Sequence, residues 1–129
     1  LRPIISEGKF SFENINVERQ ERDSKSMLNT VQQMIRVRQH HPEFGCGEFR
    51  VLDLHSSAVL GHCCQWQGEL MAAFHNFSER PQRTGVHLHD VQSGVASDAL
   101  GHEEREIKAG SFDLDLEPFG YRWVRIRKS

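Results

Sequence analysis

Residues 112–127 read FDLDLEPFGYRWVRIR, and this stretch predicts a β-structure. Its first half alternates apolar with acidic residues, namely Phe112, Leu114 and Leu116 with Asp113, Asp115 and Glu117. Such a period of two is typical of a half-buried antiparallel strand. The Pro-Phe-Gly that follows predicts a turn, after which Tyr121 begins a last strand that reaches Arg127.

The same period extends back toward residue 49 and predicts a mainly β fold. Runs at 49–54, 59–66, 70–75 and 86–89 are expected to be strands, and Gln67-Gly68 is a hairpin signal. Six or seven short strands with regular turn signals indicate an antiparallel β-sandwich. We expect residues 91–100 to be irregular, with at most one short edge strand, and 103–106 to form a charged loop.

One amphipathic helix is predicted ahead of these strands. Asp23-Ser24 is an N-cap signal, and Pro42 predicts that the helix ends near His40-His41. Its apolar stripe consists of Met27, Leu28, Val31, Met34 and Ile35. The fold class is therefore an antiparallel β-sandwich preceded by one amphipathic α-helix, whose stripe must be buried on the sandwich or on a neighbouring part of a longer protein.

Composition excludes several classes of protein. The chain has 129 residues, 37% hydrophobic and 26% charged, which fits one globular domain. The net charge of −2 argues against nucleic-acid binding. The arginines nearest the end of the sequence, Arg125 and Arg127, are expected on the solvated side of an edge strand and so do not indicate a binding site. No apolar run approaches the roughly 18–20 residues of a membrane helix.

Three cysteines without spaced pairs, and no secretory signal, predict a cytoplasmic protein. In that setting the glycosylation sequon at 76–78 is expected to match by chance. The chain begins at Leu1 rather than Met, from which we expect a fragment of a longer polypeptide.

No set of residues predicts a catalytic, cofactor-binding or metal site. The pairs His62/Cys64 and His87/His89 lack the tight turns of structural zinc sites. The acidic rows Asp113, Asp115, Glu117 and Glu103, Glu104, Glu106 resemble solvent-facing surfaces rather than glycosidase carboxylates. Neither Cys63 nor Cys64 follows a glycine elbow or opens a helix, as an activated thiol would. Three aromatic residues, Trp66, Tyr121 and Trp123, are candidates for stacking on sugar rings, although packing in the core is the favoured interpretation.

Several segments resemble a known family. The first group resembles the end of the catalytic barrel in the α-amylase superfamily and comprises Phe12-Glu13-Asn14-Ile15-Asn16-Val17-Glu18-Arg19-Gln20, Asp23, Ser26-Met27-Leu28, Met34-Ile35-Arg36-Val37-Arg38 and His41-Pro42-Glu43-Phe44-Gly45-Cys46-Gly47. The branch is that of oligo-1,6-glucosidases and trehalose synthases. Two later segments resemble the C-terminal β-domain of trehalose synthases, namely His75-Asn76-Phe77-Ser78 and Leu116-Glu117-Pro118-Phe119-Gly120-Tyr121-Arg122-Trp123. The resemblance is weak from about Gly85 to Ala109.

The resemblance implies two parts, the end of a catalytic barrel at 1–47 and a C-terminal antiparallel β-sandwich at 48–129. It implies a parent enzyme that isomerises maltose and trehalose, or hydrolyses or transfers α-glucosyl groups, by a retaining two-carboxylate mechanism. Its carboxylates and calcium site would lie upstream of Leu1, so the isolated chain is expected to be inactive. We expect a non-catalytic accessory domain packed on the barrel of the same polypeptide. The alternative is a carbohydrate-binding module in weak contact with α-glucan. The exposed helix is expected to drive self-association through Met27, Leu28, Val31 and Met34.

Overall fold

The computed structural model describes residues 7–9, 11, 13 and 16–129. Phe10, Phe12 and most of the first predicted segment lie outside them. The chain forms two compact units, Leu1–Gln39 and His40–Ser129. The described residues contain three helices, namely α1 (Val17–Arg22), α2 (Met27–His40) and α3 (Glu43–Cys46). No helix in this part of the chain has both the length and the apolar character needed to cross a membrane.

In the first unit, the predicted helix is present as α2, while α1 was not predicted. Asn16 caps α1 by accepting a hydrogen bond from the Arg19 backbone N–H at 2.9 Å. The predicted N-cap of α2 at Asp23-Ser24 is wrong by two residues, because Ser26 Oγ accepts from the Asn29 N–H at 3.2 Å. No side chain of α2 is buried, and Met27, Val31 and Ile35 are 73%, 41% and 51% exposed. The apolar stripe is therefore not buried by the described residues of its own unit.

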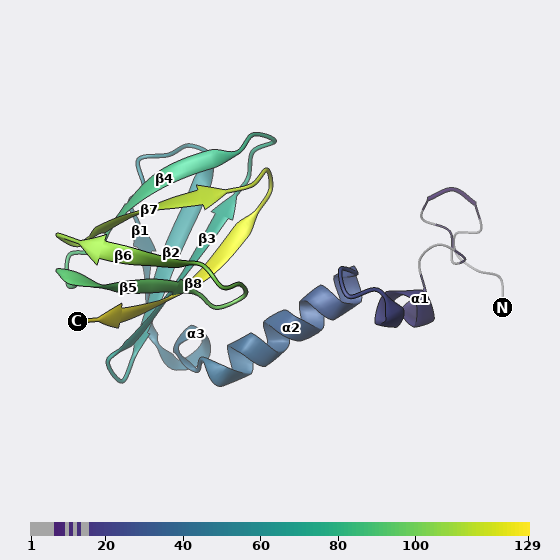
Figure 1. The fold of residues 1–129 in the computed structure, drawn as a ribbon, viewed down its shortest axis with the longest axis horizontal. Helices are drawn as coiled ribbons and strands as arrows, with labels where there is room; N and C mark the ends of the chain where they lie inside the picture. Colours follow the sequence, from purple (N-terminus) through teal and green to yellow (C-terminus); the bar gives the residue numbers. More distant parts are fainter. Residues whose placement is uncertain (1–6, 10, 12, 14–15) are drawn as a thin grey trace. The chain divides into compact units, whose positions relative to one another are not determined.

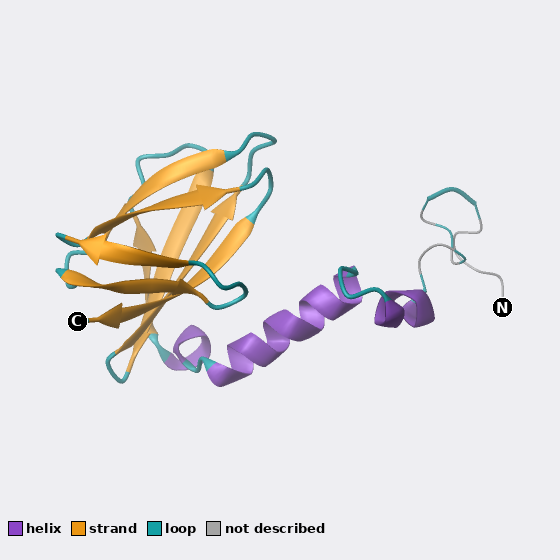
Figure 2. Ribbon diagram, viewed as in Figure 1, coloured by secondary structure: helices purple, strands orange, loops and turns teal. Residues whose placement is uncertain are grey.

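The second unit is mainly β, as predicted, with eight antiparallel strands in its described residues (Figures 1 and 2). They are β1 (Glu48–Leu52), β2 (Val59–Trp66), β3 (Glu69–Asn76), β4 (Gln82–His87), β5 (Ser93–Asp98), β6 (Glu104–Lys108), β7 (Ser111–Leu116) and β8 (Tyr121–Lys128). The strand order is β1-β2-β3-β8-β5-β6-β7-β4. The β6–β7 link is a single residue pair, Lys108 with Ser111, so the sheet bends there into two layers. The short helix α3 packs with β2 and β3 and belongs to this unit.

One hydrophobic core fills the space between the layers. Phe74 of β3, fully buried, belongs to the same cluster as Phe112 and Leu114 of β7 and Val124 of β8. Alternate residues of each strand supply this core, because successive side chains point to opposite faces. The hairpin between β2 and β3 turns at Gln67 and Gly68, both with positive φ, as the sequence predicted.

Four predictions about the strands are wrong, the first being the strand expected at 86–89, because β4 spans Gln82–His87. Residues 93–98, expected to be irregular or an edge, form β5, which pairs with both β6 and β8. Residues 104–108 form β6 instead of a charged loop. The last strand, β8, was expected at an edge but lies between β3 and β5. Arg125 and Arg127 still reach solvent, because they point away from the core.

Asn76 joins the loop after β3 to the turn before β8. Its side chain is buried, and Nδ2 donates hydrogen bonds to the carbonyl oxygens of Arg80 at 2.8 Å and Glu117 at 2.9 Å. Its Oδ1 accepts from the Ser78 backbone N–H at 2.9 Å. This amide is fully used by the fold, which supports the interpretation that the glycosylation sequon is a chance match.

Candidate interaction surface

The outer face of β1, β2, β3 and β8 is unusual because part of it is as deeply buried as the core. The strand register places Cys64, Met71 and Arg125 side by side on this face, with Ala73 and Trp123 in the next row. Met71 is completely buried and Ala73 is 2% exposed, although neither faces the space between the layers. A strand that is apolar on both faces normally has a covering layer on each.

Part of this cover comes from α3. The Phe44 ring lies 5.1 Å from the Trp123 ring, centroid to centroid, and Glu43 is 3% exposed. The Glu43 Oε2 atom has no hydrogen-bond partner among the described residues, and His41 Nδ1 lies 3.9 Å away. Burial lowers the pKa of His41, so at neutral pH the imidazole does not supply a full countercharge.

Beyond α3, four rings form a row across the uncovered part of the outer face. Phe49 of β1 lies 5.2 Å from His62 of β2, and His62 is stacked 6.4 Å from His75 of β3. His75 lies 6.2 Å from Phe77, just after β3. Phe49 and Phe77 are 65% and 67% exposed. We call Phe49, His62, His75 and Phe77 the aromatic row.

The aromatic row has apolar neighbours and carries no formal charge at neutral pH. The pKa of His62 is lowered by burial and by the nearby His75, and burial alone lowers the pKa of His75. The residues paired with the two histidines across the strands are Val51, Ala73, Leu60 and Tyr121. Val51 is 61% exposed and Leu60 44%. The charged residues on the outer face of β3 and β8 lie toward the other end of these strands, where Glu69 pairs with Arg125 at 2.8 Å and Arg127 pairs with Glu104 at 3.1 Å.

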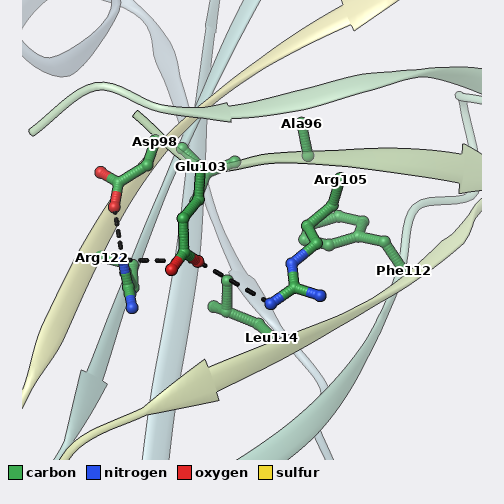
Figure 3. A pocket seen from close by; sticks show the side chains of 8 residues that line it. Ala96, Asp98, Glu103, Arg105, Phe112, Leu114 and Arg122 are labelled. Atoms are coloured by element: carbon green, nitrogen blue, oxygen red, sulfur yellow. Dashed lines mark hydrogen bonds and ion pairs between the residues drawn. The ribbon is translucent and has the colours of Figure 1, made fainter. Parts of the chain in front are cut away.

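At one end of the sandwich, a chain of ion pairs closes the space between the layers. Arg122 Nη1 lies 2.7 Å from Asp98 Oδ2 and 3.8 Å from Glu103 Oε2, and Arg105 lies 3.8 Å from the same Glu103 oxygen (Figure 3). The side chain of Asp98 is 8% exposed. The cavity that they line with Phe112 and Leu114 measures about 10 Å³, too little for anything larger than one water molecule. This cluster therefore stabilises the fold and is not a ligand site.

Five of the six carboxylates considered from the sequence are in ion pairs at the surface, and the sixth, Glu117, is exposed. Asp113 and Asp115 both approach Arg83, at 3.2 and 3.8 Å. On β6 and its approach, Glu104 pairs with Arg127 at 3.1 Å and Glu106 with Lys108 at 3.1 Å. These contacts make the acidic rows solvated faces of strands.

The two candidate pairs, His62/Cys64 and His87/His89, do not converge on a metal-binding geometry. His62 and Cys64 lie on the outer face of β2, whereas the rings of His87 and His89 pack against each other at 4.9 Å by the end of β4. Within the described residues, no three His, Cys, Asp or Glu side chains could hold one ion. Cys63 lies in the core, 2.9 Å from Nε of Arg50.

The three aromatic candidates do not form one platform. Trp66 pairs with Glu69 at one end of β3, and Tyr121 pairs with His75 at the other. Trp123 lies between them, partly covered by Phe44. Sequence reasoning missed the aromatic row, because its members come from three segments. The one available signal was that His62 and His75 fall at outward positions of their strands once the hairpin register is known.

Comparisons with known proteins agree with this architecture. Residues 68–125 match the family model described as "Sucrose hydrolase-like, C-terminal domain". The chain is 27% identical over 126 residues to a trehalose synthase of Thermus thermophilus, covering 97% of this chain and 13% of the relative. It is 28% identical over 128 residues to a trehalose synthase/amylase of Mycobacterium tuberculosis, covering 96% of this chain and 21% of the relative. The chain thus spans about a fifth or less of these two relatives.

Solved structures show the same fold. The trehalulose synthase MutB of Pseudomonas mesoacidophila superposes with a TM-score of 0.71 at 22% identity, over 90% of this chain and 20% of that one. An Anoxybacillus α-amylase gives 0.71 at 15% identity, over 79% of this chain and 22% of that one.

Proposed function

We propose that this chain, whose sequence and fold resemble the C-terminal part of trehalose synthases and related α-amylase-superfamily enzymes, is the non-catalytic accessory domain of such an enzyme. One observation carries this proposal: nearly the whole chain aligns with trehalose synthases, yet it accounts for only 13% and 21% of two of them. The chemistry of such an enzyme would then reside in the remaining length.

For the whole protein, we infer a retaining enzyme that acts on α-glucosides, either isomerising maltose and trehalose or hydrolysing and transferring α-glucosyl groups. Its nucleophile and acid/base carboxylates would lie before residue 1, in a catalytic barrel that residues 1–47 complete. The exposed apolar stripe of α2 supports this division, because a barrel helix needs such a stripe to pack on its neighbours. The three cysteines are free, which supports a cytoplasmic location.

The role of the domain would be to cover apolar surface of the barrel and so stabilise it. The test compares the isolated chain with the polypeptide encoded by the whole gene. We expect a barrel with its carboxylates immediately upstream of residue 1, activity on maltose or trehalose in the whole protein, and none in the isolated chain. Turnover of either sugar by residues 1–129 alone, or a gene without an upstream barrel, would refute the proposal.

The α2 stripe leads to a related expectation for the isolated chain. Met27 and Val31 are exposed and Leu28 and Met34 only partly covered, so we expect these chains to associate through α2. Sedimentation should show oligomers that dissociate when Met27 and Val31 are replaced by serine. A strictly monomeric chain with α2 still helical would contradict this expectation.

A second candidate function is weak contact with α-glucan through surface aromatics. Trp66 and Tyr121 are each 38% exposed, enough to stack on a sugar ring. Titration with maltose, trehalose and a longer α-glucan, followed by tryptophan fluorescence, tests it. A saturable change that Trp66→Ala abolishes would support binding, and an unchanged spectrum at high glucan concentration would reject it.

A further inference from the structure

We propose that the aromatic row is the surface through which the domain binds the catalytic part of its own polypeptide. This inference rests on the proposed function and adds to it the face that makes the contact and the chemistry of that contact. The occupant would be an apolar surface of the barrel, with aliphatic and aromatic side chains facing Phe49, His62, His75 and Phe77.

The first argument is the amount of exposed apolar surface. Phe49, Val51, Leu60 and Phe77 lie on or beside the row and are between 44% and 67% exposed. A contiguous patch of large apolar side chains on a soluble domain marks a surface that is covered in the working protein. Aromatic side chains bury more area than others and dominate the energetics of such contacts.

The second argument is where the preceding polypeptide joins the domain. Residues 40–47 enter β1 along this same outer face, since Phe44 packs on Trp123 and α3 contacts β2 and β3. The polypeptide upstream of residue 40 is thus joined to the domain on the outer face that also carries the aromatic row. A short tether gives the attached partner a high effective concentration, so a modest apolar contact is sufficient to hold it.

The third argument is charge. The residues paired directly with the row across the strands are Cys64, Val51, Ala73, Leu60 and Tyr121, none of them charged at neutral pH. The nearest outward-facing charges on these strands pair with each other at the far end, as Glu69 does with Arg125. The aromatic row therefore offers no cation to bind a nucleic acid or an acidic peptide. An apolar protein surface that covered it would bury no unpaired charge of the row.

The two histidines make this contact sensitive to pH. Their rings are 6.4 Å apart, and no carboxylate lies among the residues paired with them. Protonation of either ring would place an uncompensated charge in the contact, and protonation of both would add repulsion between them. Docking should therefore be strongest at neutral pH and weaken as the histidines protonate.

The test uses the full-length polypeptide carrying the paired substitution Phe49→Ser/Phe77→Ser. Both rings are mostly exposed in the isolated chain, so the same pair of substitutions in residues 1–129 should leave the unfolding temperature nearly unchanged. In the full-length protein, limited proteolysis between the barrel and the domain should speed up by at least about tenfold. Phe119→Ser is the matched control, because Phe119 is 68% exposed but lies on the β7–β8 turn outside the row, and it should leave cleavage unchanged.

A second variant, His62→Gln/His75→Gln, should abolish the rise in cleavage rate that the wild type shows on acidification from pH 7.5 to 5.5. If a barrel is present but the row variants are cleaved no faster than wild type, the assignment of this surface is wrong while the proposed function stands. Equal acceleration by Phe119→Ser would also overturn the assignment. A gene without a barrel would overturn both.

Discussion

Replacing Asp98 by alanine should destabilise the sandwich more than removal of any other carboxylate of its ion-pair cluster. Asp98 Oδ2 lies 2.7 Å from Arg122 Nη1, and Asp98 Oδ1 accepts from the Leu100 backbone N–H at 2.9 Å. The side chains of Asp98 and Arg122 are 8% and 25% exposed. The hydrogen bond to Asp98 is the largest cause of the raised pKa of Arg122. Removal of the carboxylate would leave a mostly buried guanidinium without its main partner.

The size of the effect follows from burial and from the remaining neighbours. Breaking a fully buried pair costs about 3–5 kcal/mol. Arg122 is a quarter exposed, and Glu103 at 3.8 Å retains part of the attraction. We therefore expect a loss of about 2 kcal/mol in the free energy of unfolding, or roughly 8–16 °C in Tm for a domain of this size.

Urea unfolding followed by tryptophan fluorescence measures this loss in the β-unit alone, because both tryptophans, Trp66 and Trp123, lie in it. Asp113→Ala is the matched control, since its pair with Arg83 is 59% and 65% exposed, and it should cost less than about 0.5 kcal/mol. A double-mutant cycle with Arg122→Met isolates the coupling energy. The reasoning is refuted if Asp98→Ala costs no more than Asp113→Ala, or if the cycle shows no coupling.

Three further outcomes are expected from the same unfolding assay. Phe74→Ala, which removes a fully buried ring from the centre of the core, should lower the free energy of unfolding by about 3–5 kcal/mol, and a loss below 1 kcal/mol would contradict the described core. Glu43→Met, which removes a buried Oε2 that accepts no hydrogen bond among the described residues, should raise the free energy of unfolding of the isolated chain by about 1 kcal/mol, and a decrease would mean that this oxygen has a hydrogen-bond partner in solution. His41, His62 and His75 have pKa values lowered below 6.5, so the unfolded chain takes up protons first on acidification. The free energy of unfolding should therefore keep its full value above pH 6.5 and fall as the pH drops below it. A free energy of unfolding that stays constant from pH 7.5 to 5 would disprove this.

The elements predicted correctly are those whose own residues show the pattern of burial. β7 alternates apolar and polar residues along its length, and α2 has an apolar stripe followed by Pro42. The signals for β5 and β6 are absent from their own sequences. β5 reads SGVASD, mostly small residues, and β6 reads EREIK, in which only Ile107 is buried. They form strands because β8 offers a free edge to β5, and β5 then offers one to β6.

The candidate surface was less predictable than the fold for a related reason. Whether His62 points outward follows from its strand, but its distance from Phe49 and His75 depends on the pairing of β1, β2 and β3. Phe77, just beyond β3, joins the row through the bend of the chain at Asn76. Single-strand periodicity contains none of this information.

The position of β8 has a consequence for biosynthesis. This strand is made after the other seven, yet it lies between β3 and β5 and supplies Val124 and Ile126 to the core. Until residue 128 has left the ribosome, β3 and β5 each present a bare edge, and the growing polypeptide holds two unjoined half-sheets that invite wrong pairing. Folding of this unit must therefore wait until β8 has been synthesised, and deletion of residues 121–128 should yield inclusion bodies rather than a slightly weakened domain.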